Sequence, residues 1–196
     1  MLKRLFDIFF SLIGLVILLP FFIIIGLIII FDSKGGIFYK QVRVGKNGKD
    51  FGLYKFRSMK TDADKKGLLT VGGRDSRITN VGYSIRKYKL DELPQLINVF
   101  IGDMSLVGPR PEVRKYVDLY NLEQQQVLLV KPGITDYASI EYFNENELLG
   151  KSENPEKTYI DEIMPAKLKL NLKYINEYTT FTDIKIIFKT LLKIIS

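Results

Sequence analysis

Residues 86–111 read RKYKLDELPQLINVFIGDMSLVGPRP and place two adjacent acids, Asp91 and Glu92, after a run of basic residues. Apolar residues recur at helical spacing after this acid pair, which predicts one amphipathic helix over about residues 92–101. Pro94 is tolerated in the first turn of such a helix, because its missing N–H would have no partner there. Asp91 then falls at the N-terminal cap, where the helix dipole favours an ionised carboxylate. An ordinary capping Asp91 followed by a solvent-exposed Glu92 also explains this helix.

The second half of this stretch ends in an arginine between two prolines. Residues 104–107 form an apolar run that predicts a short strand, and Pro109, Arg110 and Pro111 follow it after a glycine. Pro111 disfavours helical backbone at Arg110, and Pro109 is itself stiff, so we expect the arginine in an extended segment of low conformational freedom. A guanidinium held in this way suits two-point recognition of a phosphate.

The pattern DELPQLxNVxxGDMSLVGPRP over residues 91–111 resembles the signature of the bacterial sugar transferases, which are monotopic phosphoglycosyl transferases. Weaker similarity runs from residue 3 to about residue 193. The resemblance implies an enzyme, a phosphotransferase for substituted phosphate groups, that moves a sugar 1-phosphate from a UDP-sugar to undecaprenyl phosphate and releases UMP. It also implies the cytoplasmic face of the cell inner membrane, and the first membrane step of surface glycan or glycoconjugate synthesis, with downstream glycosyltransferases as further partners.

The composition is both basic and apolar. The chain has 196 residues, a formal net charge of +7 and 46% hydrophobic residues, which indicates one domain with a modest core. Nucleic acid or an anionic membrane surface would fit this charge. We favour the membrane and no nucleic acid, because the apolar excess lies at one end and no basic motif interleaved with aromatic residues occurs. Without cysteine or histidine, the chain has no disulfide and no thiolate metal site, and its chemistry must use carboxylates, Lys, Tyr, Ser or Thr.

Residues 8–31 form an uncharged and almost wholly apolar run that is long enough to cross a bilayer core. A signal peptide is disfavoured, because the run is long and no Ala-x-Ala-like cleavage site precedes the charged residues after it. A spanning helix stays open, although Pro20 would kink it. Lys3 and Arg4 flank one end and further cations flank the other, so the positive-inside rule does not choose a direction. We expect an anchor that bends at Pro20 and returns to the same face, which the resemblance also implies.

A β-hairpin is predicted after this run. Residues 37–44 and 51–59 are strand-like, and the Gly-Lys-Asn-Gly-Lys segment over residues 45–49 contains the Asn-Gly step of a tight turn. Strand alternation in the sequence KFRSM puts Lys55 and Arg57 on one face. A solvated face would explain these cations, whereas the resemblance implies that Arg57 contacts a phosphate.

Residues 60–80 are polar and rich in glycine, which predicts a flexible loop over the site. A helix over residues 81–90 then carries Arg86. Five positions separate Arg86 from Asp91, so the two side chains are expected to reach one substrate, and a structural ion pair between them is the alternative.

Beyond the acid pair the family pattern becomes incomplete. Residues 112–130 predict one or two helices, and the sequence KPGIT over residues 131–135 resembles a family turn. Residues 136–143 depart from the family and are expected to shape the sugar pocket, so the sugar cannot be named. Asn171 stands where the family usually has an acid, which leaves a supporting role for that acid open.

Residues 164–178 and 182–195 predict two helices at the end of the chain. In the second helix a lysine recurs every fourth residue beside an apolar face, which is typical of an interfacial helix, although a core helix with a solvated lysine stripe has the same spacing. The expected fold class is α+β and mainly helical. A re-entrant membrane helix over residues 1–35 precedes a catalytic domain over residues 36–196, in which a small β-hairpin and several amphipathic helices surround an active site at the cytoplasmic face.

The resemblance also implies the role of each candidate residue. Asp91 attacks the phosphorus on the sugar side and leaves a phosphosugar ester on the enzyme, while Glu92 assists as a base or as a partner of Mg²⁺. The phosphates are held by Arg57, Arg86 and Arg110, the last framed by Pro109 and Pro111. Carboxylate and phosphate oxygens suit Mg²⁺, so Asp91 and Glu92 are also its expected ligands.

A non-catalytic membrane adaptor that binds anionic lipid headgroups is the alternative function. Such an adaptor would explain the apolar run and the net charge of the chain. It would leave the acid pair and the arginine between two prolines unexplained.

Overall fold

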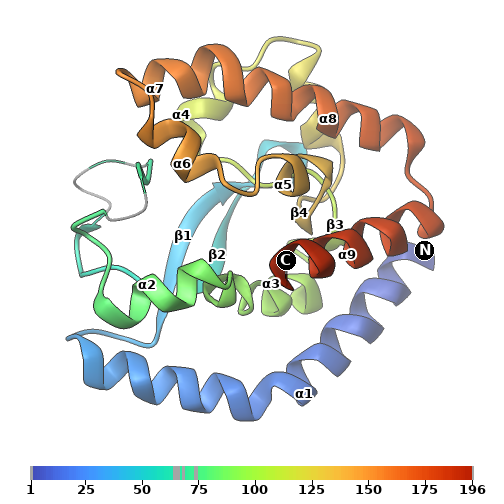
Figure 1. Ribbon diagram of the computed structural model, residues 1–196. Coiled ribbons are helices and arrows are strands. Elements are labelled where there is room, and N and C mark those ends of the chain that lie inside the picture. Colours follow the sequence, from blue (N-terminus) through green and yellow to red (C-terminus); the bar gives the residue numbers. More distant parts are fainter. Residues whose placement is uncertain (1, 64–66, 68, 73–74, 196) are drawn as a thin grey trace.

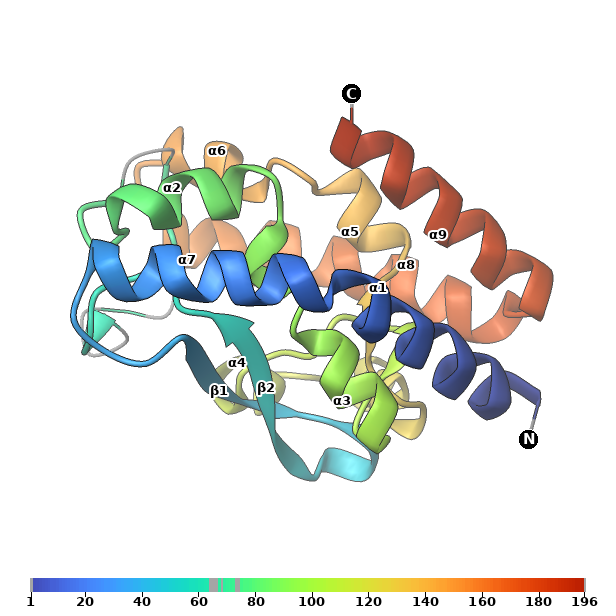
Figure 2. The same ribbon diagram turned by 90° about the horizontal axis from the view of Figure 1, so that it is seen from below.

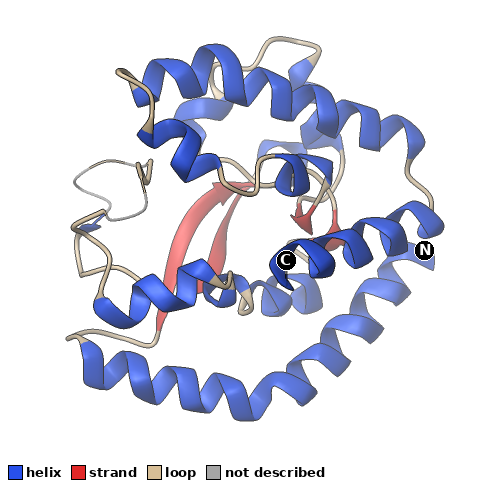
Figure 3. Ribbon diagram, viewed as in Figure 1, coloured by secondary structure: helices blue, strands red, loops and turns tan. Residues whose placement is uncertain are grey.

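The computed structural model describes residues 2–63, 67, 69–72 and 75–195. Helices dominate the fold, and two small sheets lie among them (Figures 1 and 3). The first half of the chain contains α1 (Leu2–Asp32), β1 (Phe38–Val44), η1 (Lys46–Gly48), β2 (Asp50–Phe56), α2 (Asn80–Lys87), η3 (Leu90–Glu92), α3 (Gln95–Ile101) and β3 (Ser105–Val107). The second half contains α4 (Arg114–Val117), η4 (Gln124–Leu129), β4 (Gly133–Thr135), α5 (Tyr137–Glu141), α6 (Glu145–Gly150), α7 (Pro155–Thr158), η5 (Tyr159–Ile163), α8 (Met164–Glu177) and α9 (Thr180–Ile195). The predicted class, α+β and mainly helical, is confirmed.

Helix α1 is a continuous helix that contains Pro20. Within the described residues it is the helix that is long and apolar enough to cross a membrane. Figure 1 shows α1 along the lower side of the molecule, and both Figure 1 and Figure 2 show that it changes direction part-way along its length. A proline ring collides with the carbonyl group four residues earlier, here that of Val16, so a bend in this part of the helix is expected.

The start of α1 is attached to the body of the protein by polar contacts. The Lys3 ammonium lies 2.5 Å from the carboxylate of Asp183 at the start of α9. Arg4 donates to two backbone carbonyl groups at the end of α3, at 2.6 and 2.8 Å. The buried carboxylate of Asp7 accepts hydrogen bonds of 3.0 Å from the Ser105 hydroxyl and from the backbone of β3. These contacts hold the first turns of α1 against α3, β3 and α9.

The other end of α1 is held by Arg57, which follows β2. Its guanidinium donates to the Ser33 hydroxyl at 2.6 Å, and to the carbonyl groups of Ser33 at 2.7 Å and Gly36 at 2.6 Å. These acceptors lie where α1 ends and leaves its last carbonyl groups without helical partners. Both ends of the apolar helix therefore contact the same body.

The predicted β-hairpin is confirmed. Strands β1 and β2 pair antiparallel from Phe38 opposite Phe56 to Val44 opposite Asp50. Asn47 and Gly48 in the connection have φ angles of 58° and 70°, the left-handed conformation that an Asn-Gly turn adopts readily. The hairpin brings the Lys55 end of β2 toward the turn that carries the acid pair.

Strands β3 and β4 form a second, parallel sheet. Ser105 lies opposite Gly133 and Val107 opposite Thr135. A Cβ atom on Gly133 would collide with the backbone of Gly108, so this close approach requires glycine. The strand over residues 104–107 is confirmed, whereas β4 was predicted only as a turn. This pairing fixes the segment that leads into Arg110.

The main core lies under α4, η4 and α8, and includes the buried side chains of Tyr116, Val117, Tyr159 and Leu168. The helices predicted over residues 164–178 and 182–195 are confirmed as α8 and α9, and residues 112–130 contain two short helices, α4 and η4. Helices α5, α6 and α7 were not predicted.

Candidate active site

Asp91 and Glu92 lie in η3, a single tight turn, and the prediction that Asp91 caps a helix over residues 92–101 is wrong. Helix α3 begins only after Pro94, which occupies its N-terminal cap position without any side-chain hydrogen bond. The reversal of the backbone at Lys89 sets a tight turn here instead. The N–H groups of Glu92 and Leu93 donate to the carbonyl groups of Lys89 and Leu90, three residues back, at 3.2 Å each.

Lys89 precedes this turn with a φ angle of 56°, in the left-handed region. A residue other than glycine loses roughly 1–2 kcal/mol in this conformation, and such strain is often found at functional sites. The reversal ends α2 earlier than predicted and brings Arg86 and Asp91 to one cavity. The Lys89 ammonium lies 4.9 Å from the ring centre of Phe143, in the segment that departs from the family pattern.

The Arg110 guanidinium binds Glu92 at two points. Its Nη1 lies 3.0 Å from Oε2 of Glu92, and its Nη2 donates to Oε1. Lys55 Nζ lies 3.8 Å from the same Oε1 atom. The backbone N–H of Arg110 donates to the buried carboxylate of Asp136 at 3.1 Å, which holds the extended segment in place. The arginine fork thus exists as the sequence suggests, with Glu92 as its partner in this structure, and its contact with phosphate stays a prediction.

The two neighbouring acids have opposite electrostatic environments. Asp91 is only 5% exposed, and burial followed by the negative charge of Glu92 raises its pKa. Burial also opposes ionisation of Glu92, but Arg110 and Lys55 outweigh it and hold the pKa of Glu92 well below its usual range. Burial lowers the pKa of Lys55 to about 8, against the opposing effect of Glu92. Two acids whose pKa values are pushed apart are typical of sites where each has a different role.

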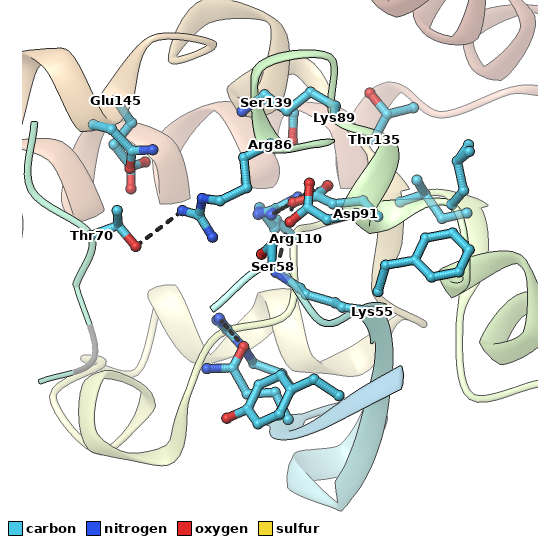
Figure 4. A pocket seen from close by; sticks show the side chains of 18 of the residues that line it. Lys55, Ser58, Thr70, Arg86, Lys89, Asp91, Arg110, Thr135, Ser139 and Glu145 are labelled. Carbon is cyan, nitrogen blue, oxygen red and sulfur yellow. Dashed lines mark hydrogen bonds and ion pairs between the residues drawn. The ribbon is translucent and has the colours of Figure 1, made fainter. Parts of the chain in front are cut away.

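These residues line one cavity of about 1320 Å³, drawn in Figure 4. Lys55, Arg86, Lys89 and Arg110 surround Asp91, and they come from β2, α2, the turn before η3 and the segment after β3. Of the predicted residues, Arg86, Asp91, Glu92 and Arg110 are therefore brought together. Lys55 and Lys89 were not predicted as site residues, although each lies in the same basic stretch as a predicted one, Arg57 and Arg86 respectively.

Arg57 and the two prolines have structural partners. Arg57 also lines the cavity, but its guanidinium donates to acceptors at the end of α1, so its contact with a phosphate stays a prediction. The Pro109 carbonyl accepts the Gly133 N–H at 3.0 Å, and the Pro111 carbonyl accepts from Arg43 at 3.1 Å. The prolines therefore fix the backbone on both sides of Arg110.

The predicted loop over residues 60–80 is described only in part, because residues 64–66, 68 and 73–74 lie outside the described residues. Within the described part, Thr70 accepts a hydrogen bond of 3.0 Å from Arg86 and lines the cavity. Arg77 binds the Asp75 carboxylate at 2.6 Å and donates to the Leu69 carbonyl at 2.5 Å. This part of the loop therefore contacts the site through Arg86.

A second polar group on the cavity wall was not predicted. Glu112, directly after Pro111, lies 2.9 Å from Arg43 and accepts hydrogen bonds from the Tyr159 hydroxyl and the Val113 N–H. Lys167 on α8 lies 2.6 Å from Glu145 on α6. The sequence signal for Glu112 is an acid directly after the second proline, but its partners Arg43 and Tyr159 lie far from it along the chain. Asn171, also on α8, is buried, and its Oδ1 has no hydrogen-bond partner among the described residues.

Asp91 and Glu92 are the carboxylates expected to bind a metal ion, and both line the cavity. The described residues contain no group of three or more acids that could hold a metal ion. Mg²⁺ commonly binds through one or two carboxylates together with substrate phosphates and water. The donor set therefore fits Mg²⁺ only as an ion shared with a phosphate substrate.

A family model described as bacterial sugar transferase matches residues 1–196. The exopolysaccharide production protein PSS of Rhizobium leguminosarum bv. phaseoli is 39% identical over 196 residues, which cover 96% of this chain and 92% of that protein. The UDP-N-acetylgalactosamine-undecaprenyl-phosphate N-acetylgalactosaminephosphotransferase of Aeromonas hydrophila is 35% identical, with 99% of this chain and 44% of that protein covered. The UDP-glucose:undecaprenyl-phosphate glucose-1-phosphate transferase of Escherichia coli (strain K12) is 37% identical, with 98% and 40% covered.

This chain spans less than half the length of the latter two relatives. Its own length, in contrast, is matched almost throughout by the family model and by all three relatives. The chain therefore belongs to the bacterial sugar transferase family.

Proposed function

We propose that this chain transfers a sugar 1-phosphate from a UDP-sugar to undecaprenyl phosphate, releases UMP, and passes through a phosphosugar ester on Asp91. The observation that carries the proposal is the buried Asp91 carboxylate surrounded by Lys55, Arg86, Lys89 and Arg110 in one cavity. Two relatives bear the names of such transferases, for two different sugars, so the sugar is left open.

The first step uses the cations to bind the diphosphate of the donor. Because these cations outnumber the two acids, the site suits a ligand with several negative charges. An oxygen of Asp91 forms a bond to the phosphorus on the sugar side, the bond from that phosphorus to the bridging oxygen breaks, and the electron pair leaves on the phosphate of UMP. Burial raises the pKa of Asp91 and reduces the hydration of its ionised form, which favours its use as a nucleophile once nearby cations stabilise that form.

In the second step an oxygen of undecaprenyl phosphate attacks the same phosphorus and the bond to Asp91 breaks, which restores the carboxylate. Glu92 is held ionised by Arg110 and Lys55, so it is better suited to fix cations than to accept a proton at neutral pH. Mg²⁺ shared by Asp91, Glu92 and the donor phosphates would further neutralise the charge on the transferring group.

The arrangement of α1 supports the proposed membrane location. One end of the helix contacts α9 through Lys3, and the other is capped by Arg57, so both ends face one body. A re-entrant anchor in the cytoplasmic face of the inner membrane satisfies these contacts, whereas a spanning helix would carry one end away from its partners. The lysines of α9 would lie at the same anionic surface, as an interfacial helix requires.

A UMP-release assay tests the proposal. The purified chain is incubated with Mg²⁺, undecaprenyl phosphate and a panel of UDP-sugars, and we expect UMP with one or a few of them. Asp91→Asn should abolish this release, while Asp50→Asn, a matched change at an exposed acid bound to Arg114 on the surface, should not. Failure of every UDP-sugar to release UMP would favour the adaptor that binds anionic headgroups. Equal UMP release by the Asp91→Asn variant would instead contradict the role proposed for Asp91.

A further inference from the structure

The cavity that contains Asp91 also has an apolar half, which the chemistry of the donor does not use. We propose that the groove between α1 and α9 holds the hydrocarbon chain of the polyprenyl phosphate acceptor and directs its phosphate to Asp91. This inference rests on the proposed function and identifies a binding site for one of its substrates.

Helices α1 and α9 form the walls of this groove. Phe6, Phe10 and Gly14 line it from α1, and Ile187, Phe188 and Leu191 line it from α9. A Cβ atom on Gly14 would lie 3.2 Å from the Leu96 side chain, so the glycine lets α1 lie close to α3 at the floor of the groove.

The floor connects the apolar half to the acid pair. Leu93 and Leu96 line the same cavity, and they follow directly after the turn that carries Asp91 and Glu92. A ligand lying along these leucines would therefore have its hydrocarbon between α1 and α9 and its polar end beside Lys55, Arg110 and Asp91.

Polar contacts fix both walls of the groove. The Lys3–Asp183 ion pair joins the start of α1 to the start of α9, and Asp183 also accepts a hydrogen bond of 2.6 Å from Tyr174. Further along α9, the hydroxyl groups of Thr190 and Thr135 lie 2.6 Å apart, which ties the helix to β4. A groove whose walls are already fixed loses little conformational entropy when a flexible chain binds in it.

The size and chemistry of the cavity favour this occupant. Its volume of about 1320 Å³ exceeds the roughly 300–1,000 Å³ of a typical small-molecule pocket. A nucleotide sugar is polar along its whole length and would leave the side of α1 and α9 uncovered. A phosphate on a long linear run of isoprene units matches a site that is cationic at one end and apolar along the other. A membrane phospholipid is the competing occupant.

Leu191 and Leu192 provide a matched pair of test positions on α9. They are adjacent, of the same type and equally exposed, at 53% and 54%, but of the two only Leu191 lines the cavity. Any general effect on membrane binding should therefore be shared by Leu191→Trp and Leu192→Trp. The chain contains no tryptophan, so each variant also carries a single indole reporter.

Kinetics form the first part of the test. We expect Leu191→Trp to raise the KM for a long-chain polyprenyl phosphate about fivefold or more, as for loss of contact with one or two buried CH₂ groups, while Leu192→Trp changes it less than about twofold. Release of UMP in a single turnover without acceptor should be unchanged in both variants. Equal effects of the two variants on this KM would overturn the groove assignment. So would a loss of acceptor-free UMP release in Leu191→Trp as large as its loss in the acceptor-dependent reaction.

Fluorescence forms the second part and needs no turnover. In phosphatidylglycerol vesicles, added long-chain polyprenyl phosphate should shift the emission of the Leu191→Trp variant and leave that of Leu192→Trp unchanged. If extra phosphatidylglycerol produces the same shift, or polyprenyl phosphate produces none, the groove does not select the acceptor. Failure of the proposed function is distinguishable, because it would appear as absence of UMP from the unmodified chain with every UDP-sugar.

Discussion

Replacement of Asp91 by Asn should abolish activity and stabilise the fold, two effects in opposite directions. An amide of the same shape cannot form the phosphosugar ester, so we expect turnover to fall by about a thousandfold or more, roughly 4 kcal/mol of transition-state stabilisation. The fold, in contrast, no longer has to bury a carboxylate that is 5% exposed and lies beside Glu92.

The stabilising effect should depend on pH in a defined direction. The folded pKa of Asp91 lies above its unfolded value, so the folded chain binds the proton more tightly and loses stability as the pH rises from the unfolded to the folded pKa. Each unit of that difference corresponds to about 1.4 kcal/mol, and about 1 kcal/mol shifts the Tm of a chain of this length by roughly 2–4 °C. Asp91→Asn should therefore raise the Tm by a few degrees at pH 7.5, with little difference at or below the unfolded pKa.

Thermal unfolding in one detergent or nanodisc preparation at pH 4 to 8 measures this directly. Asp50→Asn is the control, because this acid is exposed on the hairpin and paired with Arg114. A lower Tm for Asp91→Asn at pH 7.5 would refute the reasoning, since it would mean that Lys55, Arg86 and Lys89 stabilise the Asp91 carboxylate by more than burial destabilises it.

Three further predictions concern the cations and the anchor. Arg110→Lys should lower kcat/KM about tenfold or more, or about 1.4 kcal/mol, because an ammonium cannot make the two-point contact seen with Glu92, and unchanged kinetics would assign Arg110 a purely structural role. Because burial lowers the pKa of Lys55 to about 8, kcat/KM should fall as the pH rises above about 8 and Lys55 loses its charge. Lys55→Arg should remove this fall, and the same fall in the variant would contradict the role of the Lys55 charge. Leu2→Cys and Lys34→Cys, in a chain without cysteine, should both resist an impermeant thiol reagent in intact cells and react after lysis; labelling of Leu2→Cys alone from outside would show that α1 spans the membrane.

Much of the local structure could be predicted because its signals are local. The Asn-Gly step at residues 47–48 sets the hairpin turn with its own backbone preferences, and the long apolar run before residue 32 can hardly form anything but a helix. The spacing in α8 and α9 spans several turns, so its period is visible in the sequence. Helices α5, α6 and α7 are too short to show any period.

The misplaced helix start shows where local reasoning failed. Apolar spacing could not reveal that Lys89 would adopt a left-handed backbone and set a tight turn before α3. Pro94 does not distinguish the two arrangements, because proline is tolerated both in the first turn of the predicted helix and at the N-terminal cap of α3.

The sequence predicts which residues lie at the site better than it predicts which of them contact one another. The acid pair, Arg86 and Arg110 meet at one cavity as expected, because they lie within one stretch of chain. The binding of Arg57 to the end of α1 and the parallel pairing of β3 with β4 depend on segments that approach only in the folded protein. The close approach of the Gly108 backbone requires a glycine at position 133, but the sequence around Gly133 gives no indication that β3 is its partner strand.

The most direct test of the account is the mass of the protein after reaction with the donor alone. The chain is incubated with Mg²⁺ and its active UDP-sugar without polyprenyl phosphate, then digested and analysed by mass spectrometry. We expect one phosphosugar per chain on the peptide that contains Asp91, none in the Asp91→Asn variant, and loss of the adduct when undecaprenyl phosphate is added. UMP that appears only when the acceptor is present, with no adduct on Asp91 at any time, would show direct transfer and contradict the covalent role of this residue.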